Sequence, residues 1–299
     1  MSQIPLVSVA VLTYNSSEYV IETLNSIYNQ TYKNLELIIT DDCSKDNTIE
    51  ICKSWIETHK NRFVNVNLLI SDNNTGVSAN ANRGYRAAKG VWIKGIAGDD
   101  ILLPNCIELY VNYFEKHPNV ELCVSKVQSF SSSINGEKIH GSIFPSLQNQ
   151  QMFDMSAHEQ MIKLLEENIV PAPALIMKRD IYIKYPFMDI YKCMEDLPFL
   201  INVTKNNVKI DFLNEITTLY RISGKSISHV NNMLYPTKMY ETKVVYYLNE
   251  KKDLMKTYAP HLIRKEEKDL LLWLMSEVFF KNKRTILSKI VLKIANILI

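Results

Sequence analysis

The sequence predicts an α/β fold in which a Rossmann-like, mainly parallel sheet is flanked by helices and followed by a C-terminal helical extension. Two observations lead to this prediction. Short apolar runs alternate with helical patterns through the first hundred residues, and the runs are almost continuously apolar, as in parallel strands buried on both faces. The chain has 299 residues, 46% of them hydrophobic, so it can bury a large core.

Four apolar runs are expected to form the first strands, at residues 7–12, 35–40, 64–70 and 92–96. A helical pattern follows each of the first three runs, with apolar residues recurring at the spacing of one helical face. Strands connected in this way run parallel, so their carboxyl ends lie along one edge of the sheet. Ligands of such folds bind in the crevice beyond that edge.

Polar and acidic residues follow three of these predicted strands, and we expect them to converge on one site. They are Thr13, Tyr14 and Asn15 after the first strand, Asp41 and Asp42 after the second, and Asp99 and Asp100 after the fourth. An acid pair such as Asp41 and Asp42 suits the imide N–H of uracil or a ribose hydroxyl. Turn formation is an alternative explanation of the same pair.

The stretch GIAGDD at residues 95–100 has the outline of a cation site. Ala97 and Gly98 are small, which lets a polyanion approach the backbone. One or two carboxylates, here Asp99 and Asp100, are how Mg²⁺ or Mn²⁺ is held against substrate phosphates. The alternative is that these acids only cap the start of the next helix.

Composition and motifs argue against several other classes. The formal net charge of +2 disfavours broad nucleic-acid binding. GxGxxG does not follow the first strand and GxxxxGK[ST] does not occur, which disfavours dinucleotide oxidoreductases and P-loop enzymes. The five cysteines are scattered and lack CxxC spacing, and the N-terminal segment lacks the features of a signal peptide. A reduced, cytoplasmic setting is therefore expected.

The middle of the chain is expected to bind the acceptor. Residues 129–155 are polar, Ser-rich and without periodicity, so we predict a long loop, and long loops in compact domains are often binding loops. Further along, Glu195 and Asp196 precede an apolar helix. Asp196 could cap that helix, or one of the pair could act as a general base held at the helix start.

Two short strands, at residues 209–213 and 217–221, are expected to lead into a donor-rich loop. Arg221 and Ser226 there could bind phosphate oxygens, and His229 is a candidate third metal ligand.

The last part of the chain changes character and is expected to be helical. We therefore divide the sequence into residues 1–128, 129–230 and 231–299. Near the end, Lys289 and Lys293 share one helical face while isoleucines share the other, a basic amphipathic pattern that is too interrupted to span a membrane. We predict peripheral binding at a membrane surface. The alternative is docking on the catalytic domain or on a second subunit, as in a homodimer.

Several of these stretches together resemble the family 2 glycosyltransferases, nucleotide-sugar-dependent enzymes of the GT-A fold, most of them bacterial and inverting. The resemblance covers about residues 6–230. Its motifs, in the order typical of the family, are VSVAVLTYN, LIITDDCSKDNT, NNTGVSANANRGYRAAKG with GIAGDDILLP, and MEDLPF.

The resemblance implies a role for individual residues. Asp99 matches the last acid of the family's metal-holding DxD motif, and Asp196 matches its general base, with Glu195 beside it. Asp100 and His229 are the further candidate metal ligands. The residues expected to bind the nucleotide-sugar are Thr13, Tyr14, Asn15, Asp41, Asp42, Asn82, Asp99, Arg221 and Ser226.

The implied reaction is an inverting transfer of a sugar from a nucleotide-sugar, with UDP as the expected nucleotide, to a hydroxyl of a lipid-linked saccharide. Mn²⁺ or Mg²⁺ would assist, and the product would be an O-antigen or capsule unit. Such an enzyme would lie in the cytoplasm, peripherally on the inner face of the cell membrane. A sugar-phosphate nucleotidyltransferase is disfavoured because its phosphate loop is missing.

Two departures from the family pattern motivate a rival hypothesis. Ala97 stands where the DxD motif has its first acid, and Ala81 stands where many members carry an arginine. The rival is a non-catalytic, degenerate member that scaffolds a membrane assembly for polysaccharide synthesis.

Overall fold

The computed structural model describes residues 4–132, 137–223 and 233–298. The chain divides into two compact units, one of residues 1–164 and 168–221 and the other of residues 165–167 and 222–299. A boundary at residue 128 stays a prediction.

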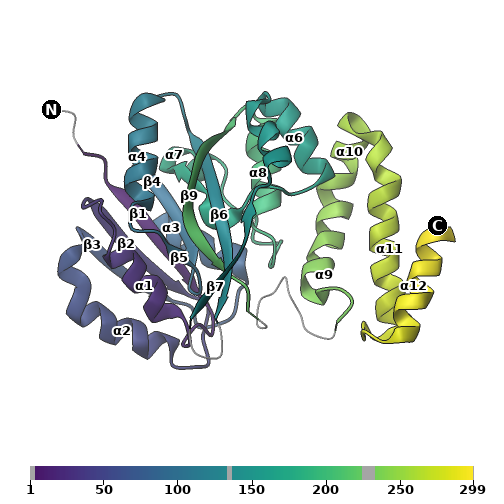
Figure 1. Cartoon of the computed structure of the whole chain (residues 1–299), viewed down its shortest axis with the longest axis horizontal. Helices are drawn as coiled ribbons and strands as arrows, with labels where there is room; N and C mark the ends of the chain where they lie inside the picture. Colours follow the sequence, from purple (N-terminus) through teal and green to yellow (C-terminus); the bar gives the residue numbers. More distant parts are fainter. Residues whose placement is uncertain (1–3, 133–136, 224–232, 299) are drawn as a thin grey trace. The chain divides into compact units, whose positions relative to one another are not determined.

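The first half of the sheet is parallel. It contains β1 (Val7–Thr13), β2 (Leu35–Asp41), β3 (Asn65–Ile70) and β4 (Trp92–Ala97), in the order β3-β2-β1-β4 (Figure 1). All seven residues of β2 are buried, which explains why its apolar residues do not alternate with exposed polar ones. The predicted fold class, a mainly parallel sheet flanked by helices, is confirmed.

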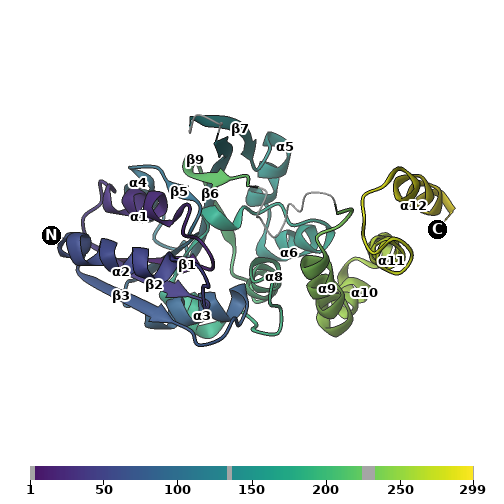
Figure 2. The ribbon, with the colours of Figure 1, turned by 90° about the horizontal axis from the view of Figure 1, so that it is seen from below.

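Helices cover both faces of this half. Helices α1 (Val20–Tyr28) and α2 (Thr48–His59) lie on one face, and α3 (Val77–Ala87) lies on the other and contacts β1 and β2 (Figure 2). Gly84 lets α3 approach closely, because a Cβ atom there would lie 2.9 Å from Cγ2 of Thr40 in β2. Helix α3 is therefore held close against the carboxyl-terminal part of β2.

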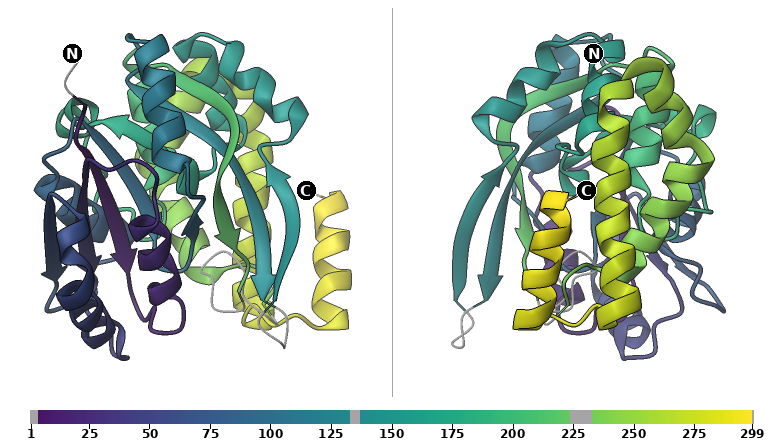
Figure 3. Two further views of the ribbon diagram at one scale, coloured as in Figure 1. Left: turned by 60° about the vertical axis from the view of Figure 1, so that its left-hand side comes forward. Right: turned by 90° about the vertical axis from the view of Figure 1, so that its right-hand side faces the viewer.

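The second half of the sheet is mixed. Beyond β4, the order continues β8-β6-β9-β5, and β7 pairs with β6. The bounds of these strands are β5 (Ile101–Leu102), β6 (Leu122–Ser132), β7 (Lys138–Phe144), β8 (Ile176–Lys178) and β9 (Ile210–Arg221). In the left view of Figure 3, β6 and β9 run side by side as long curved strands, and their pairing is parallel.

Two predictions for this region are wrong. Residues 129–155 are not one long loop, because β6 continues to Ser132, β7 pairs with it, and α5 (Leu147–Gln150) and a 3-10 turn follow. The two short strands predicted between residues 209 and 221 are one strand, β9. A register shift beside Lys126 of β6 accommodates the polar interruption that had suggested a break in β9.

The remaining helices of the first unit flank this mixed half. They are α4 (Cys106–Lys116), α6 (Ala157–Glu166), which runs into residues 165–167, α7 (Arg179–Lys184) and α8 (Asp196–Lys205).

The second unit is helical, as predicted. It contains α9 (Thr237–Tyr246), a π-helical turn (Tyr247–Lys251), α10 (Lys252–Tyr258), α11 (Ile263–Phe280) and α12 (Ile286–Leu298). The last two helices lie side by side in the right view of Figure 3, and Leu272, Leu292 and Ala295 form their small core. Within the described residues, no helix is both long enough and apolar enough to cross a bilayer.

Candidate active site

The carboxyl ends of β1, β2 and β4 meet at one edge of the sheet. In the strand registers Thr13 pairs with Asp41, and Leu12 pairs with Ala97. The Thr13 hydroxyl donates a hydrogen bond to Oδ2 of Asp41 at 2.8 Å. The predicted convergence of these strand ends is therefore confirmed.

Asp41 organises the turn between β2 and α2. Its Oδ1 accepts from the Ser44 amide at 2.8 Å and its Oδ2 from the Ser44 hydroxyl at 2.6 Å. The residue is 1% exposed. Turn formation thus accounts for the hydrogen bonds that this carboxylate makes, and its contact with a nucleoside stays a prediction.

Asp42 holds the loop that leads from β3 into α3. Its carboxylate accepts from the amide and hydroxyl of Thr75 and from the amide of Gly76. Gly76 has a φ of 91°, a left-handed conformation that favours glycine. Asp42 is 3% exposed, so this network is enclosed on most sides.

Arg83 completes the Asp42 network and was missed by the sequence analysis. Its Nη2 lies 3.5 Å from Oδ1 of Asp42 and donates to the Thr75 hydroxyl at 3.0 Å. Its Nη1 donates to Oδ1 of Asn80 at 2.8 Å. The available signal was the spacing, because residues 80 and 83 lie three apart on one face of α3. The chain therefore keeps a guanidinium near this corner although Ala81 replaces the family's arginine.

The loop after β1 is tied to the loop after β2. Asn15 adopts a φ of 51°, its amide donates to the Ser44 hydroxyl at 2.8 Å, and its Oδ1 accepts from the Lys45 amide at 2.7 Å. Tyr14 next to it is 49% exposed. The backbone tie fixes the loop while the Tyr14 ring remains accessible to a ligand.

In the acid pair that follows β4, Asp100 is buried and Asp99 is partly exposed. Asp100 is 1% exposed; its Oδ1 accepts from the Arg221 amide at 2.9 Å, while its buried Oδ2 has no hydrogen-bond partner within the described part of the chain. Burial, followed by the charge of Asp99, raises the pKa of Asp100 well above its ordinary value. Burial also raises the pKa of Asp99. β5 follows this pair directly, so the alternative that the acids cap a helix is wrong.

Arg221 supports the acid pair from the end of β9, as the last residue of the strand predicted at 217–221. Its Nε donates to the Asp99 carbonyl at 2.8 Å, and its Nη atoms bond Ser132 and Glu22. The guanidinium carbon lies 4.3 Å and 4.4 Å from the ring centroids of Tyr19 and Phe130. Arg221 is 3% exposed and engaged in these contacts, so direct binding of phosphate by Arg221 stays a prediction.

The acid pair fits a divalent cation that takes most of its ligands from elsewhere. Asp99 is partly exposed, and the free, buried Oδ2 of Asp100 is an acceptor that a cation would satisfy. Among the described residues, no cluster of three or more His, Cys, Asp or Glu side chains could enclose a metal. Mg²⁺ commonly binds one or two carboxylates, water and substrate phosphates, which suits this donor set.

Gly98, beside the acids, has a packing role. A Cβ atom at residue 98 would lie 2.9 Å from Cγ2 of Thr13 and 3.0 Å from Oγ of Ser16. The two remaining candidates of the phosphate and metal site, Ser226 and His229, lie outside the described residues.

Glu195 and Asp196 stand at the start of α8. The helix begins at Asp196 and its N-cap is Glu195, whose side chain makes no capping hydrogen bond, so the prediction of Asp196 as N-cap is wrong. Oδ2 of Asp196 accepts from Nδ2 of Asn168 at 2.8 Å. Burial, with the charge of Asp196, raises the pKa of Glu195 to about 7, and burial raises the pKa of Asp196.

The segment that precedes these acids is attached to α3. Nδ2 of Asn82 donates to the Phe187 carbonyl and to Asp189, and its Oδ1 accepts from Tyr182 and from the Phe187 amide. The Lys192 carbonyl accepts from the Val77 amide at 2.8 Å. Asn82 is 1% exposed and holds the chain in this way; its contact with the nucleotide-sugar stays a prediction.

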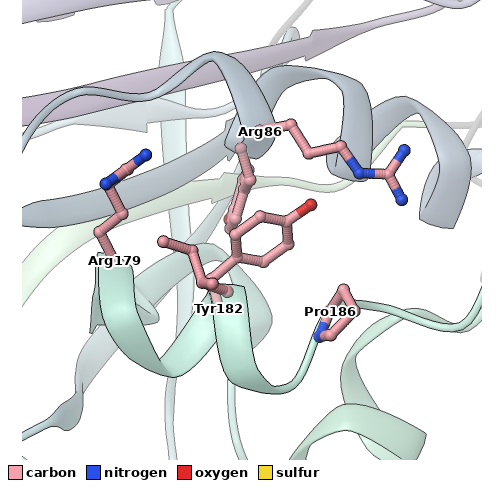
Figure 4. A pocket seen from close by; sticks show the side chains of 6 residues that line it. Arg86, Arg179, Tyr182 and Pro186 are labelled. Carbon is pink, nitrogen blue, oxygen red and sulfur yellow. The ribbon is translucent and has the colours of Figure 1, made fainter.

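A separate surface pocket contains none of the predicted site residues. It is lined by Tyr85, Arg86, Arg179, Tyr182, Ile183 and Pro186. Figure 4 shows the guanidinium groups of Arg86 and Arg179 on opposite sides of the Tyr182 ring. Because these groups do not converge, the pocket offers no paired site for an anion.

The chain is similar in sequence to known proteins. The family model described as "Glycosyl transferase family 2" matches residues 8–185. An uncharacterized glycosyltransferase of Haemophilus influenzae is 29% identical over 266 residues, which is 84% of this chain and 76% of that protein. Glycosyltransferase GlyG of Streptococcus pneumoniae is 40% identical over 116 residues, which is 38% of this chain and 37% of that protein.

Solved structures show the same fold. S. aureus TarS 1–349 in complex with UDP-GlcNAc matches with a TM-score of 0.57 and 17% identity, over 91% of this chain and 81% of that chain. The complex of the same protein with UDP matches with a TM-score of 0.56 and 19% identity, over 92% and 81%.

Proposed function

Because the chain belongs to glycosyl transferase family 2 and is a glycosyltransferase, we propose that it moves a sugar, with inversion, from a UDP-sugar to a hydroxyl of a lipid-linked saccharide. The observation that carries this proposal is the alignment of β1, β2 and β4, which brings buried carboxylates to the ligand-binding edge of a parallel sheet. UDP is preferred as the nucleotide because TarS, which shares the fold, was solved with UDP and with UDP-GlcNAc.

The nucleoside binds, in this proposal, at the ends of β1 and β2. The network of Thr13, Asp41 and Asp42 supplies rigid acceptors for the uracil imide or the ribose hydroxyls, and the guanidinium of Arg83 lies 3.5 Å from the carboxylate of Asp42. Tyr14 is exposed beside them and offers an aromatic face to the base.

The diphosphate then lies against Asp99. A divalent cation, Mn²⁺ or Mg²⁺, would be held by Asp99 with support from Asp100 and would offset the charge on the departing diphosphate. Arg221 holds both backbone and carboxylate of the pair in place. Ala97 removes one family ligand, so we expect a cation affinity that depends on the bound nucleotide.

Asp196 acts as the general base. Its carboxylate takes the proton of the acceptor hydroxyl while the hydroxyl oxygen forms a bond to the anomeric carbon and the bond from that carbon to the UDP oxygen breaks. An α-linked donor gives a β-linked product. Burial makes the Asp196 carboxylate more basic than an exposed one, which favours proton transfer.

The C-terminal unit, we propose, binds the membrane that carries the acceptor. Four large apolar residues of α12 are exposed: Ile286, Leu287, Ile290 and Ile294. The exposed cations Lys289 and Lys293 lie on the same helix. This combination suits an anionic membrane surface, and a cytoplasmic enzyme on the inner face of the cell membrane making O-antigen or capsule would meet a lipid-linked acceptor there.

A thermal-shift panel tests the donor and the metal together. UDP and a set of UDP-sugars, each with Mn²⁺, should raise the melting temperature by about 5 °C at saturating ligand, because ligand binding stabilises by mass action. GDP should not. Asp99→Asn should lose the Mn²⁺-dependent part of the shift, while Asp180→Asn, an exposed acid on α7, should keep it.

The rival, non-catalytic hypothesis makes the opposite prediction. It is favoured if no nucleotide-sugar stabilises the chain with Mn²⁺ and if no free UDP is released during incubation with these donors and membrane lipid extracts.

A further inference from the structure

The proposed base has a neighbour that the sequence motifs do not contain. Nδ2 of Asn168 donates to Oδ2 of Asp196 at 2.8 Å, and Oδ1 of Asn168 accepts from the Val170 amide at 3.3 Å. These two contacts define the orientation of the amide. If the amide were rotated by 180°, its NH₂ group would face the Val170 N–H and its carbonyl would face a carboxylate.

The chain after Asn168 is held rigidly even though Asn168 itself is exposed. Ile169 and Val170 are buried, at 9% and 4% exposure, and prolines follow at residues 171 and 173. The buried Lys94 of β4 donates from Nζ to the Pro173 carbonyl at 2.5 Å. The backbone next to Asn168 is therefore already ordered, so little conformational entropy is lost when its amide holds Asp196 in place for the reaction.

We propose that Asn168 is a positioning residue for Asp196: its amide occupies Oδ2, orients the carboxylate, and leaves Oδ1 as the atom that takes the acceptor's proton. This inference rests on the proposed function, in which Asp196 is the base. An amide suits the task because it donates a hydrogen bond to the charged carboxylate and has no acidic proton of its own to transfer.

The same contact sets the pH at which the base becomes available. The hydrogen bond from Asn168 lowers the pKa of Asp196 and opposes the effect of burial, which raises it. The titratable groups beside this carboxyl are Glu195 at the helix start and, facing Glu195, Tyr85 of α3. Without Asn168, Asp196 should keep its proton to a higher pH.

The test measures the pKa of Asp196 directly in the full-length chain by ¹³C NMR of labelled carboxyl groups. The resonance of Asp196 is assigned by its loss in Asp196→Asn. Asn168→Ala should raise that pKa by about one unit, since a hydrogen bond to a charged group contributes about that much. Asn168→Asp, which has the same shape and a second negative charge, should raise it further.

The acid limb of the pH profile of kcat should move by the same amount, measured as UDP release from UDP-GlcNAc or from the UDP-sugar that stabilises the chain most. The KM for that donor should stay unchanged. Asn206→Ala is the matched control, because Asn206 is an exposed residue at the other end of α8 whose Nδ2 donates to the Asn202 carbonyl at 2.8 Å.

The experiment distinguishes failure of the positioning role of Asn168 from failure of the proposed base, Asp196. An unshifted pKa and pH profile in both Asn168 variants, with Asp196→Asn inactive, would overturn the positioning role alone. Near-normal turnover by Asp196→Asn would overturn the proposed base, and the inference with it.

Discussion

The free energy of unfolding depends on pH through Glu195, and the charge of the neighbouring Asp196 strengthens this dependence. Burial and the adjacent carboxylate raise its pKa to about 7 from an ordinary value of 4.5. Between these two pH values the folded chain keeps the proton and the unfolded chain releases it. The free energy of unfolding therefore falls as pH rises through this range, because the contribution present below pH 4.5 is lost on the way to about pH 7.

Glu195→Gln should reduce this fall. We expect the decline in the free energy of unfolding between pH 4.5 and 7 to be smaller than in the wild type by about 2 kcal/mol, after allowing for the partial exposure of the Glu195 side chain. Urea denaturation at several pH values measures the free energy of unfolding and hence this decline. Glu57→Gln, an exposed acid on α2, is the control. Equal pH dependence in Glu195→Gln and the wild type would show that Glu195 titrates normally.

Some residues of the candidate site could be placed from their position after a predicted strand. Others reach the site only through contacts between distant parts of the chain. Thr13, Asp41 and Asp99 could be predicted, because parallel strands carry their terminal residues to one edge. The contacts of Arg83 with Asp42 and of Asn168 with Asp196 could not, since they join residues 41 and 28 positions apart. The local sequence does not indicate which loops α3 and the segment after α6 will contact.

At the scale of elements, β6 and β9 are strands whose extent hydrophobic periodicity did not predict correctly. Ser129 and Ser131–Ser132 looked like loop because serine is typical of turns. In the structure Ser131 and Ser132 pair with β7, Ser129 pairs with Tyr220 of β9, and Phe130 is 1% exposed. Pairing with a neighbouring strand satisfies the backbone and overrides a weak local preference. Strands β1, β2 and β4 were predictable because burial on both faces leaves a nearly continuous apolar run.

A buried ion pair joins the π-helical turn to α11. Nζ of Lys251 lies 2.8 Å from Oε1 of Glu266, and their side chains are 7% and 14% exposed. Burial lowers the pKa of Lys251, and the charge of Glu266 opposes that effect. The contact therefore links two elements of the second unit.

Lys251→Met should destabilise the chain by about 3 kcal/mol, because it leaves the Glu266 carboxylate enclosed without its cation. The double change Lys251→Met with Glu266→Leu should recover most of the loss. The neighbouring pair of Lys252 and Glu267 is the control: it has the same 2.8 Å separation but is 36% and 47% exposed, so Lys252→Met should cost less than about 1 kcal/mol. Urea denaturation measures all three, and equal losses in the two single variants would contradict the argument.

At the scale of the whole molecule, the question is what the second unit contacts. Helix α12 buries Ser288, Leu292 and Ala295, a narrow and mostly small face, within this unit. Ile286, Ile290 and Ile294 stay exposed, as do Val278 and Phe279 of α11, at 65% and 69%. The predicted amphipathic helix therefore docks by one face only, and its wider apolar stripe is left for a partner.

If that partner is an anionic membrane, two kinds of change should weaken binding in different ways. Replacing Ile286, Ile290 and Ile294 by Ser should lower binding to phosphatidylglycerol-containing vesicles at every salt concentration, since it removes apolar area that the lipid would bury. Replacing Lys289 and Lys293 by Gln should lower binding about fivefold per lysine at low salt and have little effect at high salt. Both sets are exposed, so folding should be preserved.

Sedimentation with vesicles measures both effects, and Ile183→Ser, a residue 57% exposed on α7, is the control for loss of an exposed isoleucine. Deletion of residues 285–299 should abolish binding. Vesicle binding that survives the deletion would exclude α12 as the anchor. A sedimentation coefficient that rises with protein concentration in the absence of lipid, and that the isoleucine changes return to the monomer value, would instead identify a second copy of the chain as the partner of this face.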